Sequence, residues 1–244
     1  MHADSIVRVA GLIGEAGRIR MLTVLLDGAG HSATELGMAA EVSPQAASSH
    51  LSKLLAGGLI VSERRGRQRL FRFHNANVAS AIEALGALAQ QPASAMPELR
   101  FARTCYDHLA GVLSIAVTGE LLRINALRGH GHEFALTPSG ERFLRSLDID
   151  AARLRDQRRS FARKCLDWTE RHHHIGGSVG AALLSRFLER KWLARMRATR
   201  AVRITHEGER QFERVFGLRC PELRFDRAST EPRPQGSGAW RSVP

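Results

Sequence analysis

The chain has 244 residues, of which 43% are hydrophobic, and a formal net charge of +12. This length suggests two domains with ordinary hydrophobic cores. No apolar run approaches the about 20 residues that span a bilayer. The start, Met1-His2-Ala3-Asp4, lacks the basic-then-apolar pattern of a signal peptide. Three widely spaced cysteines, an odd number, argue against a disulfide framework. We therefore expect a cytoplasmic protein without a membrane segment.

The positive charge favours a polyanionic partner, but it is unevenly distributed. Residues 1–91 contain nine Lys or Arg and seven Asp or Glu, a net charge of +2, so the other +10 belongs to residues 92–244. The densest basic stretches are residues 153–164 and 186–203. Charge supports nucleic-acid binding without establishing it, because a charge-rich helix is usually a solvated surface.

Two capped helices are predicted between Ser32 and Gly58. Ser32-Ala33-Thr34-Glu35 is a capping box that starts a short helix ending near Ala40. After a turn at Glu41-Val42, Ser43 caps a second helix, and Pro44 occupies its first position, where no N–H is needed. One side of this second helix is apolar and the other polar. The polar side contains Gln45, Ser48, Ser49, Ser52 and Lys53.

A basic hairpin is predicted directly after these helices. Leu59-Ile60-Val61 and Leu70-Phe71-Arg72-Phe73 are strand-like, and an arginine-rich segment joins them. A helix, a turn, a second helix and a basic hairpin in this order indicate DNA binding, with base contacts from the helix and phosphate contacts from the hairpin. A solvated hairpin in an unrelated α+β domain is the alternative. The predicted DNA-binding residues are Ser43, Gln45, Ser48, Ser49, His50, Lys53, Arg64, Arg65, Arg67 and Arg69.

The first ninety residues resemble the ArsR (ArsR/SmtB) winged-helix repressors. The resemblance rests on Arg18-Ile19-Arg20-Met21-Leu22, Thr34-Glu35-Leu36, the run from Val42 to Leu51, Ala56-Gly57-Gly58-Leu59-Ile60 and Arg65-Gly66-Arg67. It implies a homodimer that binds a near-palindromic operator and releases it when an inducer binds. The chain departs from metal-sensing members, because Ala33-Thr34-Glu35-Leu36-Gly37 has no cysteine pair and residues 75–91 have no Asp/His ligand pattern. The family's familiar metal sites therefore do not carry over.

Two outer helices are candidates for the dimer interface. The resemblance implies that the first helix and the helix over residues 75–91 pair the subunits, and the alternative is that they cover only their own domain. The predicted interface residues are Ile6, Val9, Ile13, Ile82, Leu85 and Leu88. We divide the chain into a winged helix-turn-helix domain at 1–91, a linker at 92–97, a regulatory region at 98–220 and a flexible tail at 221–244.

The regulatory region contains an internal repeat. Phe101-Ala102-Arg103-Thr104-Cys105-Tyr106-Asp107 returns as Phe161-Ala162-Arg163-Lys164-Cys165-Leu166-Asp167. His108-Leu109-Ala110-Gly111 returns as His174-Ile175-Gly176-Gly177, and residues 136–143 return as residues 204–212. Three blocks in one order indicate two copies, 98–150 and 158–220, around a shared core. We expect each copy to be a degenerate winged-helix-like unit of helix, helix, hairpin and capped helix, and the whole chain to be α+β, mainly helical with small hairpins.

The repeat places one cysteine and one histidine in each copy. We expect Cys105 and His108 to lie on one face of a helix, while Cys165 and His174 flank an insertion. If the copies face each other, these four side chains converge into a Cys₂His₂ site for a divalent, zinc-like ion. Asp107 and Asp167 are candidate ligands or acceptors for the histidines. The alternative is core packing, with Arg103–Asp107 and Arg163–Asp167 as surface pairs.

The sequence thus predicts a homodimeric DNA-binding regulator, a repressor with an unknown small-molecule or metal inducer. An architectural DNA-binding protein without an inducer and a metal or thiol-redox sensor remain alternatives. Catalysis is disfavoured, because no nucleophile elbow, phosphate-binding loop or HExxH motif occurs. We expect no enzyme activity and no certain cofactor.

Overall fold

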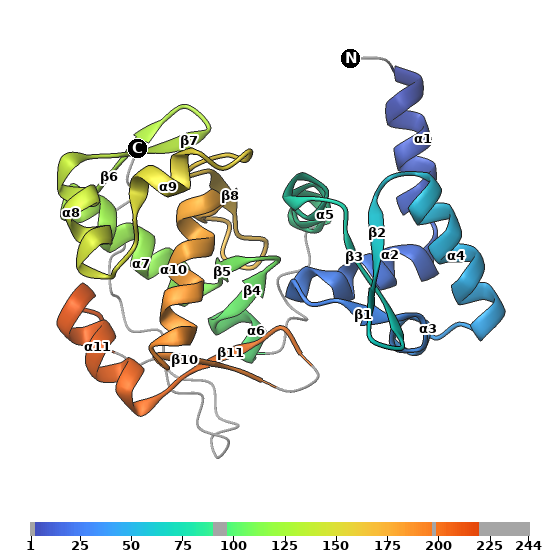
Figure 1. Ribbon diagram of the computed structural model, residues 1–244. Helices are drawn as coiled ribbons and strands as arrows, with labels where there is room; N and C mark the ends of the chain where they lie inside the picture. Colours follow the sequence, from blue (N-terminus) through green and yellow to red (C-terminus); the bar gives the residue numbers. More distant parts are fainter. Residues whose placement is uncertain (1–2, 90–96, 197–198, 220–244) are drawn as a thin grey trace, which may run out of the picture.

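The computed structural model describes residues 3–89, 97–196 and 199–219. Figure 1 shows the N-terminal region, residues 3–89, beside the C-terminal region, residues 97–219. Each region has its own large hydrophobic cluster. The expected linker, apart from Pro97, and the expected tail lie outside the described residues. Within the described ranges, every helix is too short or too polar to cross a membrane.

The N-terminal region is a winged helix-turn-helix. Its elements are α1 (Ala3–Ile13), α2 (Ala16–Val24), the 3₁₀ turn η1 (Leu25–Asp27), β1 (His31–Ser32), α3 (Ala33–Ala40), α4 (Pro44–Ala56), β2 (Ile60–Arg65), β3 (Gln68–Phe73) and α5 (Ala76–Leu88). The three strands form an antiparallel sheet in the order β1-β3-β2. This arrangement confirms the predicted helices, turn and hairpin.

Local signals explain where the helix-turn-helix begins and ends. Ser32 and Glu35 form the predicted capping box at the start of α3. Glu41 ends α3 in a left-handed conformation, with φ of 57°, and so turns the chain. Ser43 accepts a hydrogen bond from the Ala46 amide, and Pro44 opens α4. The apolar side of α4 then packs into the core through Ala47, Leu51 and Leu54.

The C-terminal region consists of short hairpins and helices. Its elements are α6 (Pro97–Phe101), β4 (Arg103–Cys105), β5 (His108–Ala110), α7 (Val112–Arg123), β6 (Leu127–His130), β7 (Glu133–Leu136), α8 (Pro138–Ser146), α9 (Ala151–Arg155), β8 (Lys164–Leu166), β9 (His173–Ile175), α10 (Gly177–Glu189), β10 (Leu193–Arg195), β11 (Val202–Ile204) and α11 (His206–Phe216). Four separate two-stranded antiparallel sheets result.

The two copies of the repeat have the same order of elements: hairpin, helix, hairpin, helix. The first copy uses β4–β5, α7, β6–β7 and α8, and the second uses β8–β9, α10, β10–β11 and α11. Thr137 caps α8 and Thr205 caps α11 through the same contacts. Gly140 and Gly208 bring these helices so close to a carbonyl that an added Cβ would lie 2.1 and 2.0 Å from its oxygen. The copies also share one hydrophobic core.

One sequence expectation was wrong. Cys105 and His108 lie on paired strands, where they are direct cross-strand partners, and not on one face of a helix. Tyr106, between them, has φ of 59°, and this left-handed conformation lets a two-residue turn reverse the chain. The helix predicted at the start of each copy is therefore a hairpin. We call β4–β5 the first Cys/His hairpin and β8–β9 the second.

Each Cys/His hairpin is held by the other copy. The hairpin β6–β7 pairs with the chain before β8, where the Phe134 amide donates to the Ala162 carbonyl at 2.7 Å. The hairpin β10–β11 pairs in the same way with the chain before β4, where the Val202 amide donates to the Ala102 carbonyl at 3.0 Å. We call β6–β7 and β10–β11 the bracing hairpins. The reciprocal exchange brings the two Cys/His hairpins face to face.

Candidate nucleic-acid interface and metal centre

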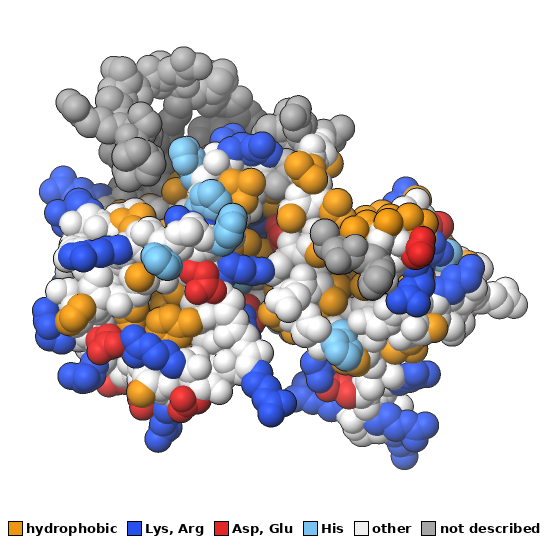
Figure 2. Space-filling view, turned by 90° about the horizontal axis from the view of Figure 1, so that it is seen from above, with side chains coloured by type: hydrophobic (Ala, Val, Ile, Leu, Met, Phe, Trp, Pro, Cys, Tyr) orange, Lys and Arg blue, Asp and Glu red, His pale blue; other side chains and the backbone are white. Residues whose placement is uncertain are grey.

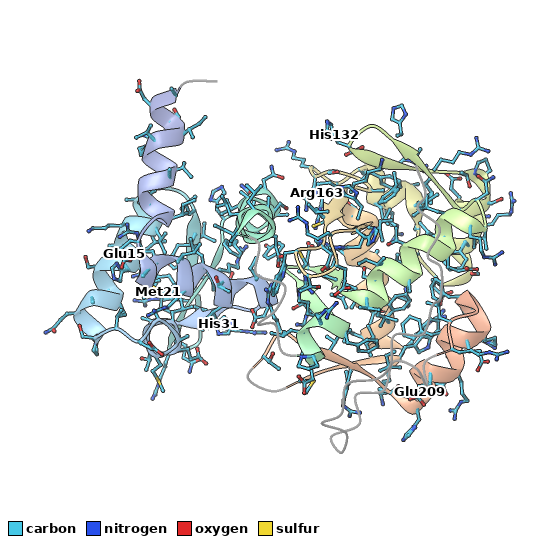
Figure 3. The ribbon with its side chains drawn as sticks, turned by 180° about the vertical axis from the view of Figure 1, so that it is seen from behind. Glu15, Met21, His31, His132, Arg163 and Glu209 are labelled. Atoms are coloured by element: carbon cyan, nitrogen blue, oxygen red, sulfur yellow. The ribbon has the colours of Figure 1, made fainter. Side chains whose placement is uncertain are left out.

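The polar face of α4 is exposed and leaves its side chains accessible. Gln45, Ser48, Ser49 and Lys53 lie on this exposed face, and Ser43 caps its start. His50 differs from the other predicted contacts, because it is half-buried and its Nδ1 lies 3.5 Å from the Glu15 carboxylate. Glu15 caps α2 at its junction with α1, as Figure 3 shows. The His50 side chain therefore contacts the junction of α1 and α2 within its own region.

The wing between β2 and β3 carries its arginines at the tip. Its strands are joined by Gly66 and Arg67, and Gly66 has the left-handed φ of 64° that a two-residue turn favours. Arg64 and Arg69 lie opposite each other, so their like charges are placed together. Arg69 is fixed by a hydrogen bond to Ser62 and lies over the Phe71 ring. All four predicted wing arginines are exposed, an arrangement suited to phosphate contacts.

The predicted dimer residues fall into two groups. Ile6, Val9, Leu85 and Leu88 are exposed, at 39–74% of their surface. Ile13 is half-buried and Ile82 is buried, and both pack against the core of the N-terminal region. Figure 1 shows α1 projecting from the rest of this region, and Figure 2, which looks toward its end, shows hydrophobic side chains gathered around it. The exposed group is thus available for contact with another surface.

The structure brings together the four candidate metal ligands. Cys105, His108, Cys165 and His174 are each at most 7% exposed, and one potential ligand atom from each lies within 4.8 Å of all the others. The two Sγ atoms are 3.9 Å apart, and the imidazole centroids are 5.2 Å apart. Each hairpin supplies a cysteine and a histidine from directly opposed strand positions.

The two repeated aspartates lie beside the histidines. Asp107 Oδ1 lies 3.4 Å from His108 Nδ1, and Asp167 Oδ2 lies 3.7 Å from His174 Nδ1. The Nε2 atoms of both histidines, and the Nδ1 atom of His174, are buried without a hydrogen-bond partner among the described residues. A buried polar atom without a partner costs free energy, and metal-bound histidines commonly turn their other nitrogen to a carboxylate. Both observations fit a metal ion at the Nε2 atoms.

Asp167 is itself held by a buried network that the sequence did not predict. Its carboxylate accepts hydrogen bonds from the Gly111 amide at 2.7 Å, the Thr169 amide at 2.9 Å and Arg103 at 3.0 Å. Arg103 and Asp167 are fully buried, whereas Asp107 pairs with Arg159. Arg103 and Asp107, which the packing alternative offered as a surface pair, therefore do not pair with each other. Although burial opposes ionisation, the Arg103 charge and these hydrogen bonds lower the pKa of Asp167 to about 2.

The electrostatics of the cluster favour a thiolate at Cys165. A hydrogen bond from Cys105 holds the pKa of Cys165 well below its usual value, against the effect of burial and with help from both histidines. The same hydrogen bond, together with burial, raises the pKa of Cys105. Burial lowers the pKa of His108, but its interactions with the Asp107 carboxylate and the Cys165 sulfur outweigh this effect and raise that pKa to about 9. These shifts favour a negative sulfur beside a cationic imidazole.

The cluster has the donors of a tetrahedral metal site, and its two sulfurs have the separation that such a site requires. Two thiolates bound to zinc at about 2.3 Å in a tetrahedron lie about 3.8 Å apart, and the observed separation is 3.9 Å. Sulfur and imidazole ligands suit soft or borderline divalent ions. Packing alone accounts for the burial of the two cysteines, but it does not account for two buried Nε2 atoms that find no hydrogen-bond partner in the described part of the chain.

Comparison with known proteins places the chain among transcription factors. No family model matches it. It is 41% identical over 222 residues to the uncharacterized HTH-type transcriptional regulator YdfF of Bacillus subtilis, a match that covers 88% of this chain and 98% of that protein.

Two of the solved structures that match this chain do so over about a third of its length. One is the homodimeric winged helix-turn-helix domain of a possible ArsR-family regulator from Mycobacterium bovis, at 23% identity over 35% of this chain and 79% of that one, with a TM-score of 0.33. Another is the cadmium sensor CmtR from Mycobacterium tuberculosis, at 30% identity over 34% of this chain and 83% of that one, with a TM-score of 0.29.

Proposed function

Because the chain belongs to the family of HTH-type transcriptional regulators, we propose that it is a homodimeric repressor whose C-terminal region senses a soft or borderline divalent metal ion. Its relationship and its winged helix-turn-helix make it a DNA-binding transcriptional regulator and not an enzyme. Beyond this function we propose three assignments: the residues that contact DNA, the dimer, and the inducer.

The exposed face of α4 and the wing support the assignment of DNA contacts. Gln45, Ser48 and Ser49 lie near the start of α4, the part of a recognition helix that meets base edges in the major groove. Arg64, Arg65 and Arg67 extend from the wing tip toward solvent, and so suit adjacent phosphates. In a dimer, two such surfaces bind two half-sites of a near-palindromic operator.

The exposed hydrophobic side chains of α1 and α5 support the dimer. α1 has no buried residue, although it contains Ile6, Val7 and Val9. Leu85 and Leu88 on α5 are likewise exposed. A monomer that left these side chains in water would forgo the free energy of burying them, about 25 cal/mol per Å² of apolar surface. A second copy of the chain is the partner that a two-fold operator requires.

The converged Cys₂His₂ cluster is the observation that carries the sensing proposal. Its four donors come from two hairpins that the other copy's bracing hairpins hold in place, and its two histidines have free, buried Nε2 atoms. Zn²⁺ and other soft or borderline divalent ions fit this donor set. We propose that binding of such an ion at Cys105, His108, Cys165 and His174 lowers the affinity of the dimer for its operator.

The test measures metal content and operator affinity in the same samples. The full chain is purified without chelators, its metal is quantified, and the affinity for a DNA site selected from genomic fragments is measured with and without Zn²⁺. We expect one ion per chain and a weaker operator complex with zinc. Cys105→Ser and Cys165→Ser should each abolish both effects, whereas Cys220→Ser, at the third cysteine of the chain, should change neither.

Three results would overturn parts of this proposal. Uniform, weak binding to all DNA would favour an architectural protein over a repressor. Full response of a metal-free protein to some other inducer would make the cluster a packing feature. Zinc that raises the unfolding temperature without changing operator affinity would make the site structural.

A thiol-redox sensor is the second candidate, and the 3.9 Å between the two Sγ atoms favours it. With hydrogen peroxide as oxidant, the Cys165 thiolate takes one oxygen to form a sulfenic acid and releases hydroxide. The Cys105 thiol then attacks that sulfur, and a disulfide and water form. Peroxide treatment of metal-free protein, followed by mass spectrometry and operator binding, distinguishes this candidate: it requires loss of two hydrogens per chain together with a changed affinity.

A further inference from the structure

The two copies of the repeat are equivalent in the Cys₂His₂ site but not in their contacts with the N-terminal region. The Thr104 amide donates to the Arg200 carbonyl at 2.8 Å, and the Lys164 amide donates to the His132 carbonyl at 3.1 Å. Thr104 and Lys164 hold the same place in the repeat, directly before the cysteine ligand. Arg200 and His132 are therefore equivalent residues of the two bracing hairpins, each bonded to the strand that carries a ligand.

Arg200 connects this strand to α5. Its guanidinium forms an ion pair with Glu83, at 2.5 Å between Nη1 and Oε1. Glu83 is 3% exposed, although its neighbours on α5 are mostly apolar. His132, the equivalent residue, is exposed and lies at the top of the C-terminal region in Figure 3. Through one hydrogen bond and one ion pair, Arg200 thus links the Cys105 strand to the helix that carries Leu85 and Leu88.

Tyr106 makes a second connection from the same hairpin. It lies in the turn between the ligands Cys105 and His108, and its amide donates to the Leu26 carbonyl at 2.6 Å. Its ring packs edge-on against Phe73 at the end of the wing, with 5.8 Å between centroids. The turn therefore packs against the core of the N-terminal region, where it contacts η1 and β3.

The fit at this turn is close. A Cβ on Gly28 would lie 2.2 Å from the Tyr106 carbonyl oxygen, so the two backbones are in direct contact. Asp27, the residue before Gly28, offers its carbonyl to Thr104 at 3.4 Å and to Arg195 at 3.2 Å. The segment from Asp27 to Gly28 leads through β1 into α3, the first helix of the helix-turn-helix. A shift of the first Cys/His hairpin must therefore move this segment or break its contacts.

From these contacts we infer that metal binding is transmitted to the DNA-binding surface and to the dimer helix by the first copy's hairpin, through Tyr106 and the Arg200–Glu83 ion pair. The inference rests on the proposed function. An ion that joins Cys105 and His108 to Cys165 and His174 fixes the position of the Tyr106 turn relative to the second copy. Coupling requires a difference in metal affinity between two states of the protein, and these contacts are the elements that distinguish the two states.

The experiment compares equivalent residues of the two copies. Arg200→Met removes the ion pair, and His132→Met places the same residue at the equivalent exposed site. For each full-length protein we measure Zn²⁺ stoichiometry and operator affinity with and without Zn²⁺. We expect zinc to weaken operator binding by about 5- to 150-fold in the wild type, the usual range of allosteric coupling. The His132 variant should keep this ratio. The Arg200 variant should bind the same amount of zinc with a ratio close to one.

Tyrosine variants keep the inference falsifiable if the Arg200 variant does not fold. Tyr106→Phe retains the ring against Phe73 and should keep the zinc-dependent change in operator affinity. Tyr106→Ala should still bind zinc but lose most of that change in affinity. Arg200→Met or Tyr106→Ala with the full wild-type ratio would overturn the inference while leaving the proposed function intact. A wild-type protein that binds no zinc, or whose operator affinity ignores zinc, would overturn the proposed function, and the inference with it.

Discussion

The N-terminal region presents its candidate functional side chains to solvent, whereas the C-terminal region encloses its candidate ligands between two hairpins. Gln45 and the wing arginines contribute little to the core, and so the fold does not depend on them. Cys105 and His174 are buried, and their neighbours Arg103 and Asp167 form a fully buried ion pair. Substitutions of these exposed side chains in the first region should therefore change function alone, while substitutions of the buried cluster in the second should change stability as well.

The largest effect is expected at Asp167. Asp167→Ala leaves the buried Arg103 guanidinium and the Gly111 amide without their acceptor. Removing one partner of a buried ion pair costs about 3–5 kcal/mol of unfolding free energy. Urea unfolding followed by circular dichroism measures the loss. Asp107→Ala is the matched control in the other copy, and its loss should be smaller because Asp107 is partly exposed. Equal losses would show that the two copies tolerate substitution alike.

A smaller effect, confined to DNA, is expected at Gln45. Gln45→Ala removes a side chain able to form a bidentate contact with adenine, so operator binding should weaken by about 1–3 kcal/mol. Binding to random DNA should change much less, and the unfolding free energy should stay within about 0.5 kcal/mol of the wild type. Fluorescence anisotropy with both DNAs measures the difference. An equal loss on both would mean that Gln45 positions the backbone without reading bases.

The wing arginines should affect all DNA sequences alike. Replacing Arg65 and Arg67 with Ala removes two positive charges that suit phosphates, so the slope of log affinity against log salt should fall by about 1 for each phosphate that the variant no longer neutralises. The control is the double variant Arg128→Ala, Arg142→Ala, which removes the same charge from exposed sites of the C-terminal region. If both double variants give the same slope, net charge and not the wing accounts for binding.

The same contrast explains how much could be predicted from sequence. The helix-turn-helix is marked by signals within a few residues: the capping box at Ser32 and Glu35, and the Ser43-Pro44 start of α4. The wing is marked by two apolar runs around a basic segment. Each of these is fixed by its own neighbours, so one sequence suffices to locate it.

The Cys₂His₂ cluster was predicted from the repeat, but its local structure was not. Cys105-x-x-His108 fits both a helix face and a hairpin with a two-residue turn. The hairpin needs a left-handed residue, and here that residue is Tyr106, which gives no such signal because Asn, Asp or Gly usually takes this role. Arg103 pairs with Asp167 across the two copies, and pairing over such a distance in sequence leaves no periodic pattern.

Contacts between the regions were also missed, although one carried a signal. Glu83 stands in an otherwise mostly apolar helix, between Ile82 and Leu85. An acidic residue in such a stripe needs a partner when it is buried. The sequence does not identify that partner, because Arg200 is one of many arginines in the basic stretch 186–203.

The smallest effect is expected where the two regions meet, at His31. A hydrogen bond to Asp27 raises the pKa of His31 above its usual 6.5, against the opposing effect of burial. Because the folded-state pKa is raised, this contribution to stability is fully present below the unfolded value of about 6.5 and is lost as pH rises through the folded value. We expect this contribution to stability to amount to less than about 1 kcal/mol, the usual value of a partly exposed pair.

The unfolding free energy of the wild type should exceed that of His31→Gln most at about pH 6 and least at about pH 9. A pH-independent difference for His31→Gln would mean that the His31–Asp27 contact does not stabilise the junction through its charge.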